Sequence, residues 1–73
     1  LTPREVEIVK AVAGGDSNRD IAGRLEISLQ TVKHHLTSIF DKTGTSSRLE
    51  LALFAIRNRL AKRASSSRLE VPV

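Results

Sequence analysis

The stretch from residue 18 to residue 34, NRDIAGRLEISLQTVKH, constrains the fold of this chain more than any other segment. Its first half places Ile21 and Leu25 on one apolar face of a short helix, and residues 26–27 follow as a tight turn. Ser28 then stands where an N-cap residue begins a second helix. Two short helices joined by a tight turn predict a helix-turn-helix, a motif whose second helix enters the DNA major groove.

Each of the four expected helices opens on a capping residue. In three of the four cases an acidic residue follows three positions later, as in a capping box. The caps are Thr2, Ser17, Ser28 and Ser47, and the acids are Glu5, Asp20 and Glu50. Gly14-Gly15 ends the first helix and Gly44 ends the third. No segment alternates apolar and polar residues as a strand does, so the sequence predicts an all-α fold of four helices.

Length and composition fit one small domain. The chain has 73 residues, and its helical periodicity is lost after Leu60 in a Ser-rich run. We therefore expect one helix-turn-helix DNA-binding domain over residues 1–60, with the motif itself at about 18–37, and a flexible, disordered tail over 61–73. The chain begins at Leu1 and not at Met, which predicts that it is a fragment of a longer protein.

The cysteine count and the apolar runs exclude several classes of protein. The chain has no Cys, hence no disulfide framework or thiolate metal site, which fits a reducing, cytoplasmic location. The longest apolar stretch, 51–56, is too short to span a bilayer, so no membrane partner is expected. The sequence also lacks a paired nucleophile and base, a glycine-rich phosphate loop and a cluster of metal ligands. We therefore expect no enzyme activity, no cofactor and no metal.

The charge balance favours a nucleic-acid partner only mildly. The chain carries a net charge of +4 and has a pI near 10.4, which is typical of proteins that bind nucleic acid. However, residues 1–60 hold nine Lys or Arg against seven Asp or Glu, so this part is only +2. The remaining charge lies in the tail, and charge alone does not decide the function.

The helix predicted over 28–43 has a polar face that can contact DNA bases. The side opposite Val32 carries Gln30, Lys33, His34 and Thr37. A Gln can pair with adenine, a Lys can donate to guanine, and a Thr offers a hydroxyl or a methyl group. Periodicity alone leaves open that these residues form an ordinary solvated face. The preceding helix and the tight turn favour base contacts.

Five further residues are candidate phosphate contacts, which position a protein on DNA without reading its sequence. They are Asn18, Arg19, Thr31, His35 and Lys42. The alternative for each is structural: capping for Asn18 and Thr31, packing for His35, and solvent exposure for the two cations. Adjacent residues on a helix diverge by about 100°, so the His pair is not expected to share a metal ion.

The helix predicted over 47–60 has apolar residues on two sides. The stripe assigned to the core is Leu49, Ala52, Leu53, Ile56 and Leu60. The opposite strip is Leu51, Phe54, Ala55 and Asn58. A monomer would expose Leu and Phe on this second strip, which predicts a homodimer interface there. The alternative is that the strip packs against the preceding domain.

Five short motifs in combination resemble the LuxR-type helix-turn-helix, the output domain of NarL/FixJ-type response regulators and quorum-sensing regulators. They are LTPRE at 1–5, SNRDIA at 17–22, IS at 27–28, TVKHH at 31–35 and KTG at 42–44. The resemblance extends to about residue 60. It implies a four-helix domain that binds DNA as a dimer, with the third helix in the major groove and the fourth at the dimer contact. It also implies that Lys33, His34 and Thr37 approach bases and that Thr31 and Lys42 approach the backbone.

Two positions depart from the pattern of that family. Thr37 stands where relatives often carry Lys, Arg or Asn, and Asp41 stands where a basic residue is often found. Fewer cationic contacts predict a shallower dependence of DNA affinity on salt.

The expected function is sequence-specific DNA binding by the C-terminal output domain of a bacterial transcriptional regulator, in particular a two-component response regulator. The expected partners are double-stranded DNA, a second copy of the chain and an N-terminal regulatory domain, and this function leaves room for a contact with RNA polymerase. Two alternatives stay open at this point. One is the promoter-binding region of a sigma factor, which shares the Leu-Thr-x-Arg-Glu opening. The other is a helical protein-interaction module that does not bind DNA.

Overall fold

The computed structural model describes residues 1–60, which contain four α-helices. The helices are α1 (Pro3–Ala13), α2 (Asn18–Leu25), α3 (Leu29–Thr43) and α4 (Arg48–Arg57). No strand occurs among the described residues, which confirms the predicted all-α class. In this part of the chain no helix is long and apolar enough to cross a membrane. The tail predicted at 61–73 lies outside the described residues.

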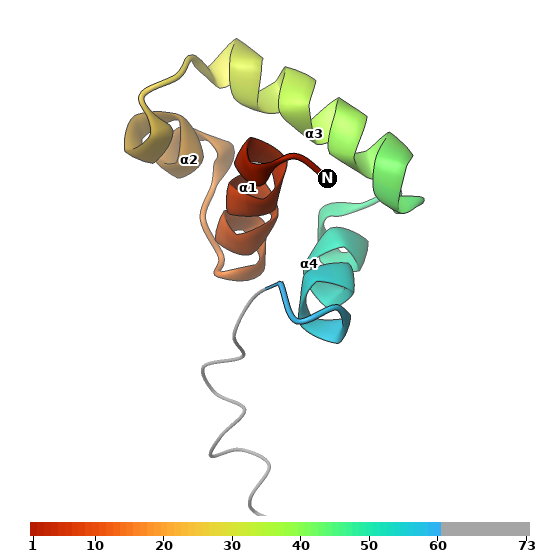
Figure 1. Cartoon of the computed structure of the whole chain (residues 1–73). Helices are drawn as coiled ribbons and strands as arrows, with labels where there is room; N and C mark the ends of the chain where they lie inside the picture. Colours follow the sequence, from red (N-terminus) through yellow and green to blue (C-terminus); the bar gives the residue numbers. More distant parts are fainter. Residues whose placement is uncertain (61–73) are drawn as a thin grey trace, which may run out of the picture.

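α1 lies at the centre of the domain. It packs against both α3 and α4, and α2 packs against α3 (Figure 1). In this view α3 runs across the top, with α2 near its first residues and α4 below its last ones. The inner side of α3 is therefore covered by the other helices, and its outer side faces away from them.

The predicted N-caps are confirmed at all four helices, because each cap side chain accepts a hydrogen bond from the amide three residues on. These caps are Thr2, Ser17, Ser28 and Ser47. Glu5 and Asp20 complete two capping boxes by accepting from the backbone amide of their own cap. The third predicted box is wrong, since the Glu50 carboxylate accepts from the Ser46 amide at 2.7 Å and not from Ser47. Glu50 therefore ties the preceding loop to α4.

The turn between α2 and α3 depends on one residue in the left-handed conformation. Glu26 has φ 57° and ψ 46°, a conformation that costs a residue other than Gly roughly 1–2 kcal/mol. Directly after it, the Ile27 amide donates to the Ala22 carbonyl at 3.0 Å, and Ile27 packs against the core. This sharp reversal places Ser28 at the start of α3, as the helix-turn-helix pattern predicted.

All four helices contribute to the core. Its buried apolar residues are Ile8, Val9, Val12, Ile21, Val32, Leu36, Ile39, Leu51 and Ala55. α1 and α3 supply six of these nine residues, and α3 is held by packing against both α1 and α2.

The predicted orientation of α4 is wrong. Leu51 and Ala55, which were assigned to the dimer strip, are fully buried in the core, and Phe54 packs against it. Leu49 and Leu53, which were assigned to the core, are 70% and 44% exposed. The physical reason is that α4 has apolar residues on almost every side, so periodicity alone does not select its inner face.

α4 also ends earlier than predicted. Its last residue is Arg57, and Asn58 is an exposed C-cap whose side-chain amide donates to the Phe54 carbonyl at 2.8 Å. Arg59 then adopts a φ of 58°, and Leu60 packs against the core beyond the helix end. Within the predicted dimer strip, only Asn58 is exposed.

Gly23 offers a test of the helix that precedes the turn. It lies exposed in the middle of α2, and a Cβ atom added there would meet no atom within 4 Å. Ala loses less conformational entropy than Gly in a helix, so Gly23→Ala should stabilise the domain by about 0.5–1 kcal/mol. Chemical denaturation followed by circular dichroism measures this change. Gly44→Ala is the contrasting variant and should destabilise, because Gly44 has a φ of 72°. A Gly23→Ala variant no more stable than the wild type contradicts the expectation.

Candidate nucleic-acid interface

The outer side of α3 presents the residues predicted to contact bases. The structure places Gln30, Lys33, His34 and Thr37 in exposed positions along this helix. The inner side is held in the core by Val32, Leu36 and Ile39. Because the same helix carries both sets, the polar side chains project from a rigid, well-anchored element.

Thr37 and Lys33 offer different chemistry to a ligand. The Thr37 hydroxyl donates to the Lys33 carbonyl at 3.1 Å, so its proton is used within the helix. An acceptor oxygen and a methyl group remain, and these suit an exocyclic amine or the methyl group of thymine. The Lys33 ammonium forms no ion pair with a carboxylate of residues 1–60. Its donors are therefore available for guanine or for a phosphate oxygen.

His34 and His35 lie on different parts of the helix surface. Their ring centroids are 6.4 Å apart and their planes are tilted by 58°. His34 is exposed, whereas His35 is half-buried. Among the described residues, no group of three or more His, Cys, Asp or Glu side chains is arranged to hold a metal ion. The two rings are placed for separate contacts.

Three of the candidate phosphate contacts lie at the starts of α2 and α3. Arg19 is exposed in the first turn of α2. Asn18, half-buried beside it, accepts a hydrogen bond at Oδ1 from Arg48 at 2.7 Å. Thr31 is half-buried, and its hydroxyl shares a 2.8 Å hydrogen bond with the hydroxyl of Ser28. Thr31 thus takes part in the cap of α3. Capping was the structural role that the sequence left open for Thr31 beside a phosphate contact.

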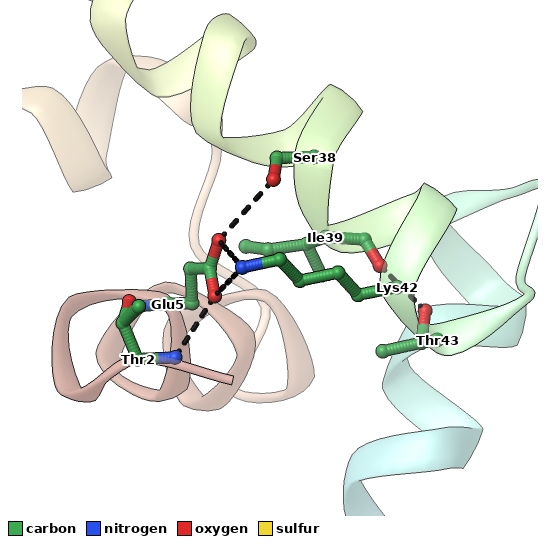
Figure 2. A network of polar contacts seen from close by, with 6 residues as sticks. All are labelled: Thr2, Glu5, Ser38, Ile39, Lys42 and Thr43. Atoms are coloured by element: carbon green, nitrogen blue, oxygen red, sulfur yellow. Dashed lines mark hydrogen bonds and ion pairs between the residues drawn. The ribbon is translucent and has the colours of Figure 1, made fainter.

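Lys42 is already paired within the domain. Its ammonium lies 2.9 and 3.0 Å from the two carboxylate oxygens of Glu5, in the first turn of α1 (Figure 2). The Ser38 hydroxyl donates to the same carboxylate at 3.3 Å, and the Thr2 amide donates at 2.9 Å. Glu5 is only 4% exposed. This network, here called the Glu5 network, joins the start of α1 to the last turns of α3.

The contacts of the Glu5 network lower the pKa of Glu5 from about 4.5 to about 2. The largest cause is the hydrogen bond from the Thr2 amide, followed by the bond from the Lys42 ammonium. The sequence indicated only a capping role for Glu5, because nothing local connects it with a Lys 37 positions away. The charge of Lys42 is largely balanced before any DNA is present.

Two other Arg contacts near α2 also have no local signal in the sequence. Arg24 lies 3.0 Å from the carboxylate of Asp16. Arg48, at the start of α4, donates to Asn18 and to the Asp16 carbonyl. Both contacts fix the segment that leads into α2.

Comparison with known proteins decides the family. Residues 1–55 match the family described as bacterial regulatory proteins of the luxR family, GerE. The chain belongs to the LuxR family. Its domain is the LuxR-type helix-turn-helix, a DNA-binding domain of transcriptional regulators, and the family is not one of enzymes. This confirms the resemblance drawn from the sequence motifs and favours it over the sigma-factor alternative.

The relatives that contain a similar domain differ in length. The transcriptional regulatory protein LiaR of Bacillus subtilis (strain 168) is 43% identical over 60 residues, which is 82% of this chain and 28% of LiaR. The crystal structure of the response regulator ChrA of a heme-sensing two-component system has a TM-score of 0.77 and 42% identity, covering 82% of this chain and 30% of ChrA. The transcription factor GerE has a TM-score of 0.76 and 34% identity, covering 85% of this chain and 92% of GerE. The chain thus spans under a third of LiaR and ChrA.

The Glu5 network makes the stability of this LuxR-type domain depend on pH in a defined window. Because folding lowers the pKa of Glu5, its ionised form stabilises the folded state fully above about pH 4.5, and this contribution is lost as the pH falls toward 2. We expect Glu5→Gln to be less stable than the wild type at neutral pH and to lose less stability across this window. Chemical denaturation at a series of pH values measures both effects.

Asp20→Asn is the matched control for Glu5→Gln. The pKa of Asp20 is also lowered, first by the hydrogen bond from the Ser17 amide, but Asp20 is exposed. Its capping box lies within α2 and its loop, whereas the Glu5 carboxylate joins two helices. Asp20→Asn should therefore flatten the pH dependence less, and equal effects of the two substitutions contradict this ranking.

Proposed function

We propose that this domain binds double-stranded DNA in a sequence-specific way, with α3 in the major groove. The observation that carries the proposal is the division of α3 into a buried inner side and an exposed polar outer side. The outer side carries the proposed base contacts Gln30, Lys33, His34 and Thr37. α2 packs against α3, as the first helix of a helix-turn-helix supports the second.

Phosphate contacts are proposed for residues at the start of α2 and along α3. They are Asn18, Arg19, Thr31 and His35, with Lys42 at the far end of the helix. Arg19 is the one permanent cation among the first four, and Lys42 shares its charge with Glu5. Few counterions are then released on binding, so the salt dependence of affinity should be shallow.

The whole-protein role with the most support is a C-terminal output domain of a two-component response regulator. ChrA is a response regulator, and LiaR is a transcriptional regulatory protein of which this chain spans only 28%. An N-terminal regulatory domain, a cytoplasmic location and a contact with RNA polymerase belong to this role as further proposals. GerE favours a second candidate, a regulator that consists of little more than this domain, because the chain covers 92% of it.

The proposed homodimer contact lies on the exposed side of α4, in place of the strip that is buried in the core. Leu49 and Leu53 are one helical turn apart and are 70% and 44% exposed. Burying both against a second copy removes this apolar surface from water. Glu50 and Arg57 are exposed on the same helix. In a two-fold antiparallel pair, Glu50 of each copy would approach Arg57 of the other.

Selection from a randomised duplex pool near physiological salt tests sequence recognition. The wild-type domain should enrich a two-fold symmetric site whose half-site spacing reflects the separation of the two α3 helices. Enrichment of a single half-site would contradict dimer formation by this domain alone. Retention of duplexes without any preferred sequence would contradict sequence-specific binding.

Lys33→Ala and His34→Ala test the base contacts directly. Each should reduce the preference for the selected site over a scrambled duplex by about tenfold, since one good base contact contributes about 1–3 kcal/mol of discrimination. Fluorescence anisotropy with both duplexes measures this ratio. Lys10→Ala removes an exposed cation from α1 and serves as the control for net charge. Equal losses on the two duplexes would show that Lys33 and His34 contact the backbone instead.

Leu53→Asp tests the proposed dimer contact. A carboxylate at this position should weaken self-association by more than about tenfold, because the charge would be buried without a partner. Sedimentation equilibrium measures the association, and circular dichroism checks that the helices are retained. Leu29→Asp makes the same chemical change at a 40% exposed residue of α3 and should leave association unchanged. A Leu53→Asp variant that associates like the wild type excludes this contact.

A further inference from the structure

Arg48 makes a contact that connects two distant parts of the chain. It is the first residue of α4, and its guanidinium reaches the segment that leads into α2. Nη1 donates to Asn18 Oδ1 at 2.7 Å, and Nη2 donates to the Asp16 carbonyl at 2.6 Å. The two acceptors lie on either side of Ser17, the N-cap of α2.

This contact joins helices that are not extensively packed together. The main helix contacts of the domain are α1 with α4, α2 with α3, α1 with α3 and α3 with α4. α2 and α4 are not among these pairs, so the hydrogen bond from Arg48 to Asn18, with the one to the loop just before α2, is a principal link between them. A planar guanidinium that makes two bonds from different nitrogens also fixes the direction of approach.

The bond from Arg48 sets the orientation of the Asn18 amide. An amide group presents an acceptor oxygen on one side and two N–H donors on the other. Because Oδ1 accepts from Arg48, Nδ2 lies on the opposite edge of the planar amide group, away from that bond. Among residues 1–60, Nδ2 donates to no acceptor. A phosphate oxygen only accepts hydrogen bonds, so this is the orientation in which Asn18 can bind it.

The electrostatics of the position argue against a purely local role for Arg48. It occupies the first turn of α4 and also lies beside the first residue of α2. Both places are positive ends of helix dipoles, where a cation is unfavourable and an acid is preferred. A residue of this charge therefore does not stabilise either helix through the dipole. Its favourable contribution is the pair of hydrogen bonds to Asn18 of α2 and to Asp16 in the loop before it.

We infer that Arg48 is a positioning residue for DNA binding, which holds the Asn18 amide with its donors outward, toward a phosphate of the DNA backbone. The inference rests on the proposed function, in which Asn18 is a phosphate contact. In this inference Arg48 acts through Asn18 and does not itself bind the phosphate. Its position on α4 also joins the proposed dimer helix to the end of α2 that approaches DNA.

A double-mutant cycle tests the coupling between the two residues. Wild type, Asn18→Ala, Arg48→Ala and the double variant are titrated with a short duplex of scrambled sequence at several salt concentrations. Each single variant should bind about tenfold more weakly, the scale of one hydrogen bond to a charged group. The double variant should bind no more weakly than the singles, because both remove the same contact. Lys10→Ala controls for the loss of one exposed cation.

The slope of log affinity against log salt concentration distinguishes a positioning role of Arg48 from a direct contact of Arg48 with phosphate. A cation that binds phosphate itself adds about 0.9 to this slope. Arg48→Ala should keep the wild-type slope, and a reduction of that size would show that Arg48 contacts DNA directly and overturn the inference. Additive losses in the double variant, or an Asn18→Ala variant that binds like the wild type, would overturn it as well. If the wild type itself shows no salt-dependent binding, the proposed function fails, which is a distinguishable result.

Asn18→Asp tests the same inference without removing the contact with Arg48. The carboxylate still accepts from the guanidinium and is favourable at the start of α2, so thermal stability should be at least that of the wild type. It has no N–H donor and repels phosphate, so DNA affinity should fall by more than about tenfold. A folded Asn18→Asp variant that binds DNA like the wild type would overturn the inference.

Discussion

The packing of the apolar side of α1 against α3 and α4 is the contact on which the rest of the domain depends. Ile8 and Val9 are completely buried there, and Ile39 of α3 and Leu51 of α4 are enclosed in the same cluster. A folded part of about 60 residues has little apolar surface to bury, so one central helix must serve two partners. The Glu5 network adds a directional contact to this packing, since it fixes where along α1 the last turns of α3 lie.

The distribution of charge shows why net charge was a weak guide to function. Several cations are paired inside the domain: Lys42 with Glu5, Arg24 with Asp16, and Arg48 with polar groups at the start of α2. Lys33, by contrast, has no carboxylate partner within residues 1–60. What distinguishes the proposed interface is therefore the group of exposed polar side chains around Lys33 on one helix, and not an excess of positive charge.

The sequence predicted the features of the fold that depend on neighbouring residues. The four caps, the ends of α1 and α3 at glycines and the exposed side of α3 all follow from local chemistry. The inner side of α4 could not be predicted in this way. Apolar residues occur on several sides of this helix, and only the shape of the core decides which of them are buried. Contacts such as Glu5 with Lys42 and Arg48 with Asn18 join residues 37 and 30 positions apart, so no local pattern indicates them. The family resemblance added the candidate roles of α3, and it gave no information on these contacts.

α3 keeps its anchoring side chains and its outward side chains in separate sets. Val32, Leu36 and Ile39 hold the helix, while Gln30, His34 and Thr37 make no contact on which that packing depends. Substitutions on the outer side should therefore be nearly neutral for folding. After a gene duplication, one copy could drift at these surface positions and acquire a different operator while both copies stay folded. The same separation makes this small domain a practical scaffold for engineering new target sites.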